Sequence, residues 1–146
     1  MKPIIPFLET MITQSCNLSC AGCTNYSDLQ HEKGYVTWAQ GREWLQAWQQ
    51  KLQIPDFGII GGEPLINPQV IDWLVGVRNL LPETQIRITT NGLLLHKHPD
   101  LVNLLHELGN VVFKITVHVN SIALEDSITK IMQSKSWEPV YEFGIN

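Results

Sequence analysis

The sequence lacks a basic surface, a long apolar run and a phosphate-binding loop, and each absence narrows the functions open to it. Ten Lys and Arg residues against fourteen Asp and Glu give a net charge of −4, so we expect no nucleic-acid partner. No apolar stretch approaches the roughly 18 residues of a membrane span, so we expect no membrane partner. Residues 1–9 are too short and too broken by Pro3 and Pro6 to suggest a signal peptide, which predicts a cytoplasmic protein. No G-x-x-x-x-G-K-[ST] loop is present.

Cysteine is scarce, with three in 146 residues, and all three lie in one run. Cys16, Cys20 and Cys23 follow a C-x₃-C-x₂-C spacing, and an odd number of thiols cannot all pair as disulfides. In a reducing cytoplasm such thiols favour metal binding or catalysis. We favour an iron–sulfur cluster with three protein ligands and one open iron. Two alternatives stay open, a zinc site in which His31 is the nearest fourth ligand and cysteines that are simply buried.

Short apolar runs alternate with amphipathic stretches along the whole chain, which predicts βα units around a parallel sheet in a single domain, residues 1–146. Thr37 and Gln40 predict a capping box at the start of the first helix. The spacing of Trp44 and Trp48 on that helix predicts core packing. The predicted strands are residues 5–13, 57–60, 85–89, 111–119 and a marginal 139–143, and the predicted helices are 37–53, 68–81, 99–108 and 124–132.

Each candidate loop follows the carboxyl end of a predicted strand. Besides the cysteine run, these are Gly61-Gly62-Glu63-Pro64, Thr90-Asn91-Gly92 and Thr116 to His118. In barrels and open α/β sheets ligands bind at that edge, so we expect the loops to share one rim. Taken singly, the two glycine-containing loops are ordinary turns, and we expect Asn67 to cap the next helix with Pro68 at its first position.

Taken together, the motifs resemble the radical S-adenosylmethionine (SAM) superfamily. The motifs are the cysteine run, then Gly61-Gly62-Glu63-Pro64, then Ile88-Thr89-Thr90-Asn91-Gly92, and the resemblance covers about Phe7 to Val119. The family's barrel generally has six βα units. The fold class expected here is α/β, a partial (β/α) barrel of about four βα units with parallel strands.

The resemblance implies a set of cofactors and the residues that hold them. Cys16, Cys20 and Cys23 would bind three irons of a [4Fe–4S] cluster, and the amine and carboxylate of SAM would chelate the fourth. Reductive cleavage of SAM would give a 5′-deoxyadenosyl radical that abstracts hydrogen from an unknown substrate. An electron donor such as a flavodoxin or ferredoxin is implied as a partner. The implied SAM-binding residues are Gly61, Gly62, Glu63, Pro64, Thr90, Asn91, Thr116 and His118.

Two departures from the family pattern keep other functions open. Gly22 stands where the family usually has an aromatic residue, and the number of βα units is low. A homodimer, a partner chain, or a protein or peptide substrate would then cover the open side of the barrel. Gly22-Cys23-Thr24-Asn25 is similar to short activating enzymes of glycyl-radical proteins of the anaerobic ribonucleotide reductase type. The other alternative is a truncated, non-catalytic accessory protein that binds a cluster or metal.

Overall fold

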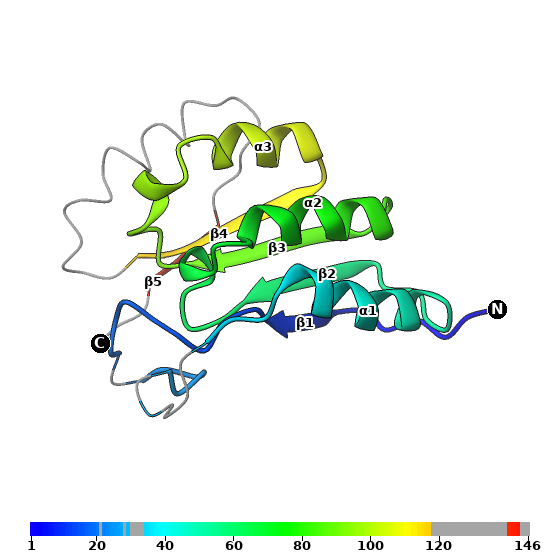
Figure 1. Cartoon of the computed structure of the whole chain (residues 1–146), viewed down its shortest axis with the longest axis horizontal. Coiled ribbons are helices and arrows are strands. Elements are labelled where there is room, and N and C mark those ends of the chain that lie inside the picture. The colour runs from blue at the N-terminus through cyan, green and yellow to red at the C-terminus, as the bar shows by residue number, and fades with distance from the viewer. Residues whose placement is uncertain (21, 28, 30–33, 118–139, 144–146) are drawn as a thin grey trace.

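Parallel strands in chain order form one open sheet, and helices cover one of its faces (Figure 1). This computed structural model describes residues 1–20, 22–27, 29, 34–117 and 140–143. The elements are β1 (Leu8–Met11), α1 (Trp38–Gln49), β2 (Asp56–Ile60), the 3₁₀ turn η1 (Pro64–Ile66), α2 (Val70–Leu80), β3 (Gln85–Thr90), the 3₁₀ turn η2 (Leu95–Lys97), α3 (Leu101–Leu108), β4 (Val111–Val117) and β5 (Val140–Phe143).

The strand order β1-β2-β3-β4-β5 confirms the predicted α/β class and the partial barrel. Every neighbouring pair is parallel, with Glu9 opposite Gly58 and Thr89 opposite Lys114 in register. Each crossover adds the next strand on the same side of the sheet. All the described crossover helices therefore lie on one face, as in a barrel wall, and no described helix covers the other face. The marginal fifth strand is confirmed, whereas the helix predicted at 124–132 lies outside the described residues.

The helix α1 begins where it was predicted to begin, but the side chains that it buries differ from the prediction. Thr37 is its N-cap and forms the expected capping box with Gln40. The helix ends at Gln49, short of the predicted residue 53. The predicted core packing of Trp44 and Trp48 is wrong, because their side chains are 40% and 39% exposed. Leu45, between them in the sequence, is buried.

Two other tryptophans join α1 to α2. The rings of Trp38 and Trp73 meet edge to face with centroids 5.3 Å apart. Each ring lies against a glycine of the opposite helix, Trp73 against Gly41 and Trp38 against Gly76. A Cβ at either glycine would overlap the indole, so these two positions set how closely the helices approach. The fully buried Trp73 lies in the core beneath the sheet.

The segment before α2 differs from the prediction. Pro68 precedes the helix, which begins at Val70, and Asn67 is the C-cap of η1. The side chain of Asn67 is fully buried: its Oδ1 accepts from Gln69 N–H at 2.9 Å just before the helix, and its Nδ2 donates to the carbonyls of Ile12 and Val36 at 2.8 and 3.0 Å. Asn67 thereby fixes the end of the first strand segment, which leads into the cysteines. Within the described residues, no helix is long and apolar enough to cross a membrane.

Candidate metal and cofactor site

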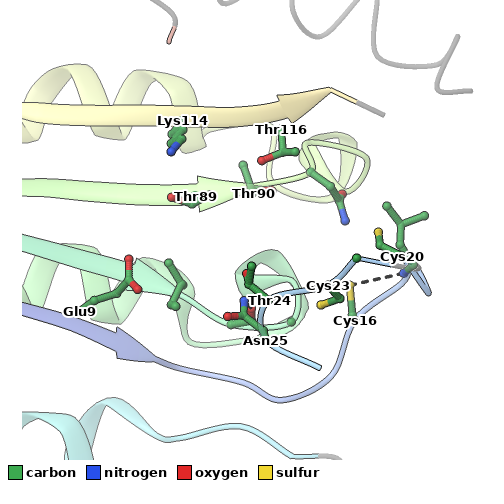
Figure 2. A pocket seen from close by; sticks show the side chains of 16 residues that line it. Glu9, Cys16, Cys20, Cys23, Thr24, Asn25, Thr89, Thr90, Lys114 and Thr116 are labelled. Atoms are coloured by element: carbon green, nitrogen blue, oxygen red, sulfur yellow. Dashed lines mark hydrogen bonds between the residues drawn. The ribbon is translucent and has the colours of Figure 1, made fainter. Parts of the chain in front are cut away.

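A cavity of about 420 Å³ opens at the carboxyl ends of the strands, and all three cysteines line it (Figure 2). Its walls come from segments far apart in the sequence. Its lining includes Glu9, Cys16, Cys20, Gly22, Cys23, Asn25, Gly61, Gly62, Thr89, Thr90, Asn91, Lys114 and Thr116. The predicted shared rim is therefore present, because parallel strands bring their following loops to one edge.

Backbone N–H groups surround two of the thiols. Leu18 N–H donates to Cys16 Sγ at 3.4 Å. Burial nevertheless raises the pKa of the Cys16 thiol, and the nearby charges of Glu63 and Cys20 act in the same direction. The pKa of Cys23 is lowered overall. Burial acts to raise it, but hydrogen bonds from the backbone and hydroxyl of Ser27 and from two neighbouring N–H groups outweigh burial.

The turn after Cys23 explains those donors. Tyr26 N–H donates to the Cys23 carbonyl at 3.2 Å, and Tyr26 adopts a positive φ of 50°. This conformation folds the chain back so that successive N–H groups turn toward one sulfur. A thiolate at Cys23 is therefore favoured, as metal ligation requires.

The glycine loop lies directly against the chain that leads into the cysteines. Gly62 N–H donates to the carbonyl of Thr13 at 2.9 Å, and Glu63 N–H donates to the carbonyl of Ser15 at 2.8 Å. A Cβ at Gly62 would come within 2.4 Å of the Ser15 oxygen. Only glycine permits this approach, so Gly62 joins the two loops and exposes its backbone to the cavity.

Two side-chain amides tie the cysteine run to the rim. Asn25 Nδ2 donates to the Gly61 carbonyl at 2.7 Å. Asn91 Nδ2 donates to Asn17 Oδ1 at 2.8 Å. The first bond joins the Cys23 side of the run to the loop after β2, and the second joins the Cys16 side to the end of β3. The run is therefore held at both ends relative to the cavity.

The predicted site residues divide into three groups. The three cysteines, Gly61, Gly62, Thr90, Asn91 and Thr116 all line the cavity. Glu63 and Pro64 lie behind it: both are buried, and the carboxylate of Glu63 accepts hydrogen bonds from Leu65, Thr90 and Asn91. His118 lies outside the described residues.

Sequence reasoning missed two charged residues of the cavity wall, Glu9 and Lys114. Both alternate with more buried residues of the same strand. Glu9 is exposed between the half-buried Leu8 and Thr10, and Lys114 lies between Phe113 and Ile115, which are buried. A strict period-2 reading would have placed them on the face opposite the helices. Asn25 lies two residues after Cys23 in the motif, but no local sequence signal predicts its bond to Gly61.

The chemistry of the donors fits a cluster with one open position. Three partly exposed thiols face one cavity, and N–H donors turn toward the sulfurs of Cys16 and Cys23. Among the described residues, no three or more His, Cys, Asp or Glu side chains are placed to hold a single metal ion. A cluster does not require this, because each thiolate binds a separate iron. The zinc alternative needs a fourth ligand, and its candidate His31 lies outside the described residues.

The fold and the cysteine-lined rim define a partial (β/α) barrel protein with a cofactor site at the carboxyl ends of its strands. The family model of the radical SAM superfamily matches residues 10–143, and the chain belongs to that superfamily. The resemblance seen in the motifs is thus confirmed.

Curated relatives are similar over part of their length. The chain is 36% identical over 98 residues to a GTP 3′,8-cyclase of Trichormus variabilis, a match that covers 62% of this chain and 29% of the relative. It is 28% identical over 144 residues to a GTP 3′,8-cyclase of Alkaliphilus oremlandii, covering 97% of this chain and 42% of the relative. The chain therefore spans less than half the length of these relatives.

A solved structure of BtrN in complex with AdoMet and 2-DOIA has a similar fold. Its TM-score is 0.68 at 20% identity, and the match covers 97% of this chain and 57% of BtrN. At this identity the likeness concerns the fold alone. It supports the interpretation of the open sheet as part of a radical SAM barrel.

Proposed function

We propose that this chain is a radical SAM enzyme whose cluster is held by Cys16, Cys20 and Cys23. The observation that carries the proposal is that the three thiols and the glycine loop line one cavity of a radical SAM fold. When bound, the cluster and SAM supply a one-electron cleavage of SAM to methionine and a 5′-deoxyadenosyl radical, which takes a hydrogen atom from the substrate. The protein orients these groups and limits the access of water.

Different residues of the chain have different roles in this scheme. The N–H groups around Cys23 stabilise its thiolate as a ligand, and Leu18 N–H acts against the effect of burial at Cys16. Gly61 and Gly62 present backbone to the cavity, where the amino end of SAM would bind. Thr90, Asn91 and Thr116 form the wall beside them, where the rest of SAM would lie. Glu63 acts from behind by holding Thr90 and Asn91 in place.

The scheme needs an electron from outside. We propose a flavodoxin or ferredoxin as the donor, because the cysteine run lies at the rim and its thiols are partly exposed. We place the protein in the cytoplasm, where thiols stay reduced. We do not extend GTP cyclisation to this chain, since the GTP 3′,8-cyclases match it over less than half of their own length.

The test is anaerobic reconstitution of the cluster, followed by SAM and a strong reductant, with 5′-deoxyadenosine as the readout. Cys20→Ala should lose both the cluster and the product. Ser19→Ala, an exposed neighbour in the same run, is the matched control and should keep both. A wild-type protein with a full cluster that yields no 5′-deoxyadenosine would contradict the catalytic proposal.

A second candidate is a non-catalytic protein that binds the cluster. The open sheet favours it, because the described strands do not close into a barrel and the described helices lie on one face only. Iron and sulfide well below four per chain after reconstitution, with weak binding of SAM, would support this candidate. The glycyl-radical activating function stays a prediction that rests on the Gly22 to Asn25 run.

A further inference from the structure

Two charged side chains lie in the cavity behind the cysteines. Glu9 comes from β1 and Lys114 from β4, and both line the same cavity as the thiols. Figure 2 shows the cysteines beyond the ends of the strands, with Glu9 and Lys114 farther back along them. Apart from the thiols, they are the ionisable residues among the described residues that line this cavity. The site described above uses neither of them.

The sheet leaves room for the Glu9 side chain. Glu9 lies opposite Gly58 in register, and a Cβ at Gly58 would lie 3.1 Å from both Cγ and Oε2 of Glu9. The carboxylate therefore extends over a glycine, where a larger residue would displace it. Glu9 is exposed, and within the part of the chain that the structure describes no cation forms an ion pair with it. Its carboxylate faces the cavity open to a ligand.

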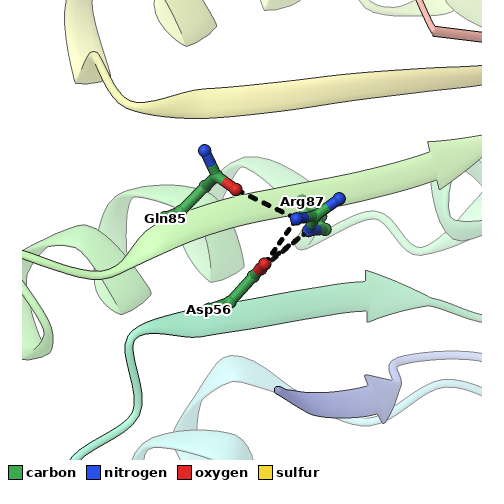
Figure 3. Close-up of polar contacts among 3 residues, drawn as sticks. All are labelled: Asp56, Gln85 and Arg87. Carbon is green, nitrogen blue, oxygen red and sulfur yellow. Dashed lines mark hydrogen bonds and ion pairs between the residues drawn. The ribbon is translucent and has the colours of Figure 1, made fainter. Parts of the chain in front are cut away.

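Another cation on this face of the sheet, Arg87, forms an ion pair with an acidic residue. Arg87 lies next to Gly58 in register and forms an ion pair with Asp56 at 2.6 Å (Figure 3). Its Nε also donates to Asp56, and a further nitrogen donates to Gln85 at 3.1 Å. Arg87 does not line the cavity. Its charge is paired with that of Asp56.

Lys114 brings the opposite charge to the other side of the cavity. It lies opposite Thr89, which also lines the cavity. β1 and β4 are three strand spacings apart, or roughly 14 Å along the sheet. A ligand that met both side chains would thus carry its two charges at opposite ends.

We infer that Glu9 and Lys114 select a zwitterionic substrate, with an ammonium group bound at Glu9 and a carboxylate bound at Lys114. The inference rests on the proposed function, because it assigns the substrate class of that same cavity. A carboxylate stabilises an ammonium through a charge-assisted hydrogen bond and repels a polyphosphate. The substrate class is therefore an amino acid or a related amino-carboxylate, and nucleoside triphosphates are disfavoured.

The test uses ω-amino acids from 4-aminobutanoate to 8-aminooctanoate as probes, with hexanoate, hexylamine and tripolyphosphate as comparisons. Binding is measured to the cluster-loaded protein at saturating SAM, and SAM affinity is measured in parallel. At least one amino acid of the series should bind at least tenfold more tightly than hexanoate, hexylamine or tripolyphosphate. Equal affinity for all probes, or binding of none, would overturn the inference.

Variants test which ligand group, ammonium or carboxylate, each of the two charged side chains binds. Glu9→Gln should weaken the best amino acid about tenfold and leave hexanoate unchanged, whereas Lys114→Met should weaken the amino acid and hexanoate alike. Glu43→Gln, an exposed carboxylate on α1, is the matched control and should change neither. If Glu9→Gln weakens SAM instead of the amino acid, Glu9 serves the cofactor and the inference is wrong. Failure of SAM itself to bind wild-type protein would instead count against the proposed function.

Discussion

Thr90 donates its hydroxyl to the buried carboxylate of Glu63 at 2.5 Å, and this bond joins the loop after β2 to the end of β3. The other oxygen of Glu63 accepts from Asn91 N–H at 2.8 Å. Glu63 is only 1% exposed, and both of its oxygens have protein donors. Glu63 therefore supports the cavity wall from behind. Hydrogen-bond donors of the protein already occupy its carboxylate oxygens, where the ammonium group of a ligand would otherwise bind.

Burial gives Glu63 a measurable pH signature. Desolvation raises the pKa of its carboxyl, against the opposing effect of the hydrogen bonds from Thr90, Asn91 and Leu65 and of the charge of His98. The folded protein then binds a proton more readily than the unfolded chain, so the contribution of Glu63 to the free energy of unfolding falls as pH rises from its unfolded pKa to its folded pKa. Below and above that window the contribution is constant.

The measurement is the free energy of unfolding of wild type and Glu63→Gln, from denaturant titrations between pH 4 and 8. The difference, wild type minus variant, should decrease as the pH rises, because the variant lacks the titrating group. Glu107→Gln, on the exposed side of α3, is the control for the substitution itself. A Glu63 difference that grows with pH would contradict the direction of the pKa shift.

The bond from Asn25 to Gly61 should control how firmly the cluster is held. Asn25→Ala leaves a carbonyl unpaired and should cost about 1–2 kcal/mol of stability. It should also release iron to a chelator faster than wild type does, because the turn after Cys23 loses its tie to the rim. Asn79→Ala on the exposed face of α2 is the control of the same residue type. Equal rates of iron release in Asn25→Ala and wild type would refute the role.

Gly62 should be the least replaceable glycine of the rim. In Gly62→Ala the new Cβ would overlap the backbone of Ser15 and the hydroxyl of Ser27, so the loop must move at a cost of about 1–3 kcal/mol. SAM affinity should fall with it. A Cβ at Gly34 would meet nothing within 4 Å, so Gly34→Ala should stay within about 0.5 kcal/mol of wild type. Thermal unfolding and SAM titration of the two variants distinguish them, and similar behaviour would count against the packing argument.

The tryptophans offer a test of the core. Trp73→Ala removes a fully buried ring that lies against Gly41 and donates to the Val36 carbonyl at 3.0 Å, and should cost about 3–5 kcal/mol. Trp44→Ala, at a position 40% exposed, should cost less than about 1 kcal/mol. Chemical denaturation measures both. A larger loss for Trp44 than for Trp73 would reverse the assignment of the core.

The element types and the rim could be predicted because their causes are local. The capping box of Thr37 and Gln40, the alternation of strands and helices and the order of the loops are visible in short stretches of sequence. The failures arose where distant segments decide the outcome. Asn67 was expected to cap the helix, and its Oδ1 does accept from Gln69 N–H at 2.9 Å, but its Nδ2 also donates to the distant carbonyls of Ile12 and Val36, which no local pattern reveals. Trp44 and Trp48 have helical spacing, but α1 turns Leu45 toward the core.

The sequence by itself determined the class of the site: three thiols in one run, followed in order by loops at the ends of successive strands. That information suffices because ligand type and parallel topology follow from residue identity and periodicity. Only the tertiary structure decided what surrounds the thiols. It placed Glu63 behind the cavity and brought Glu9 and Lys114 into it, because a parallel sheet sets side by side residues that are far apart in the chain.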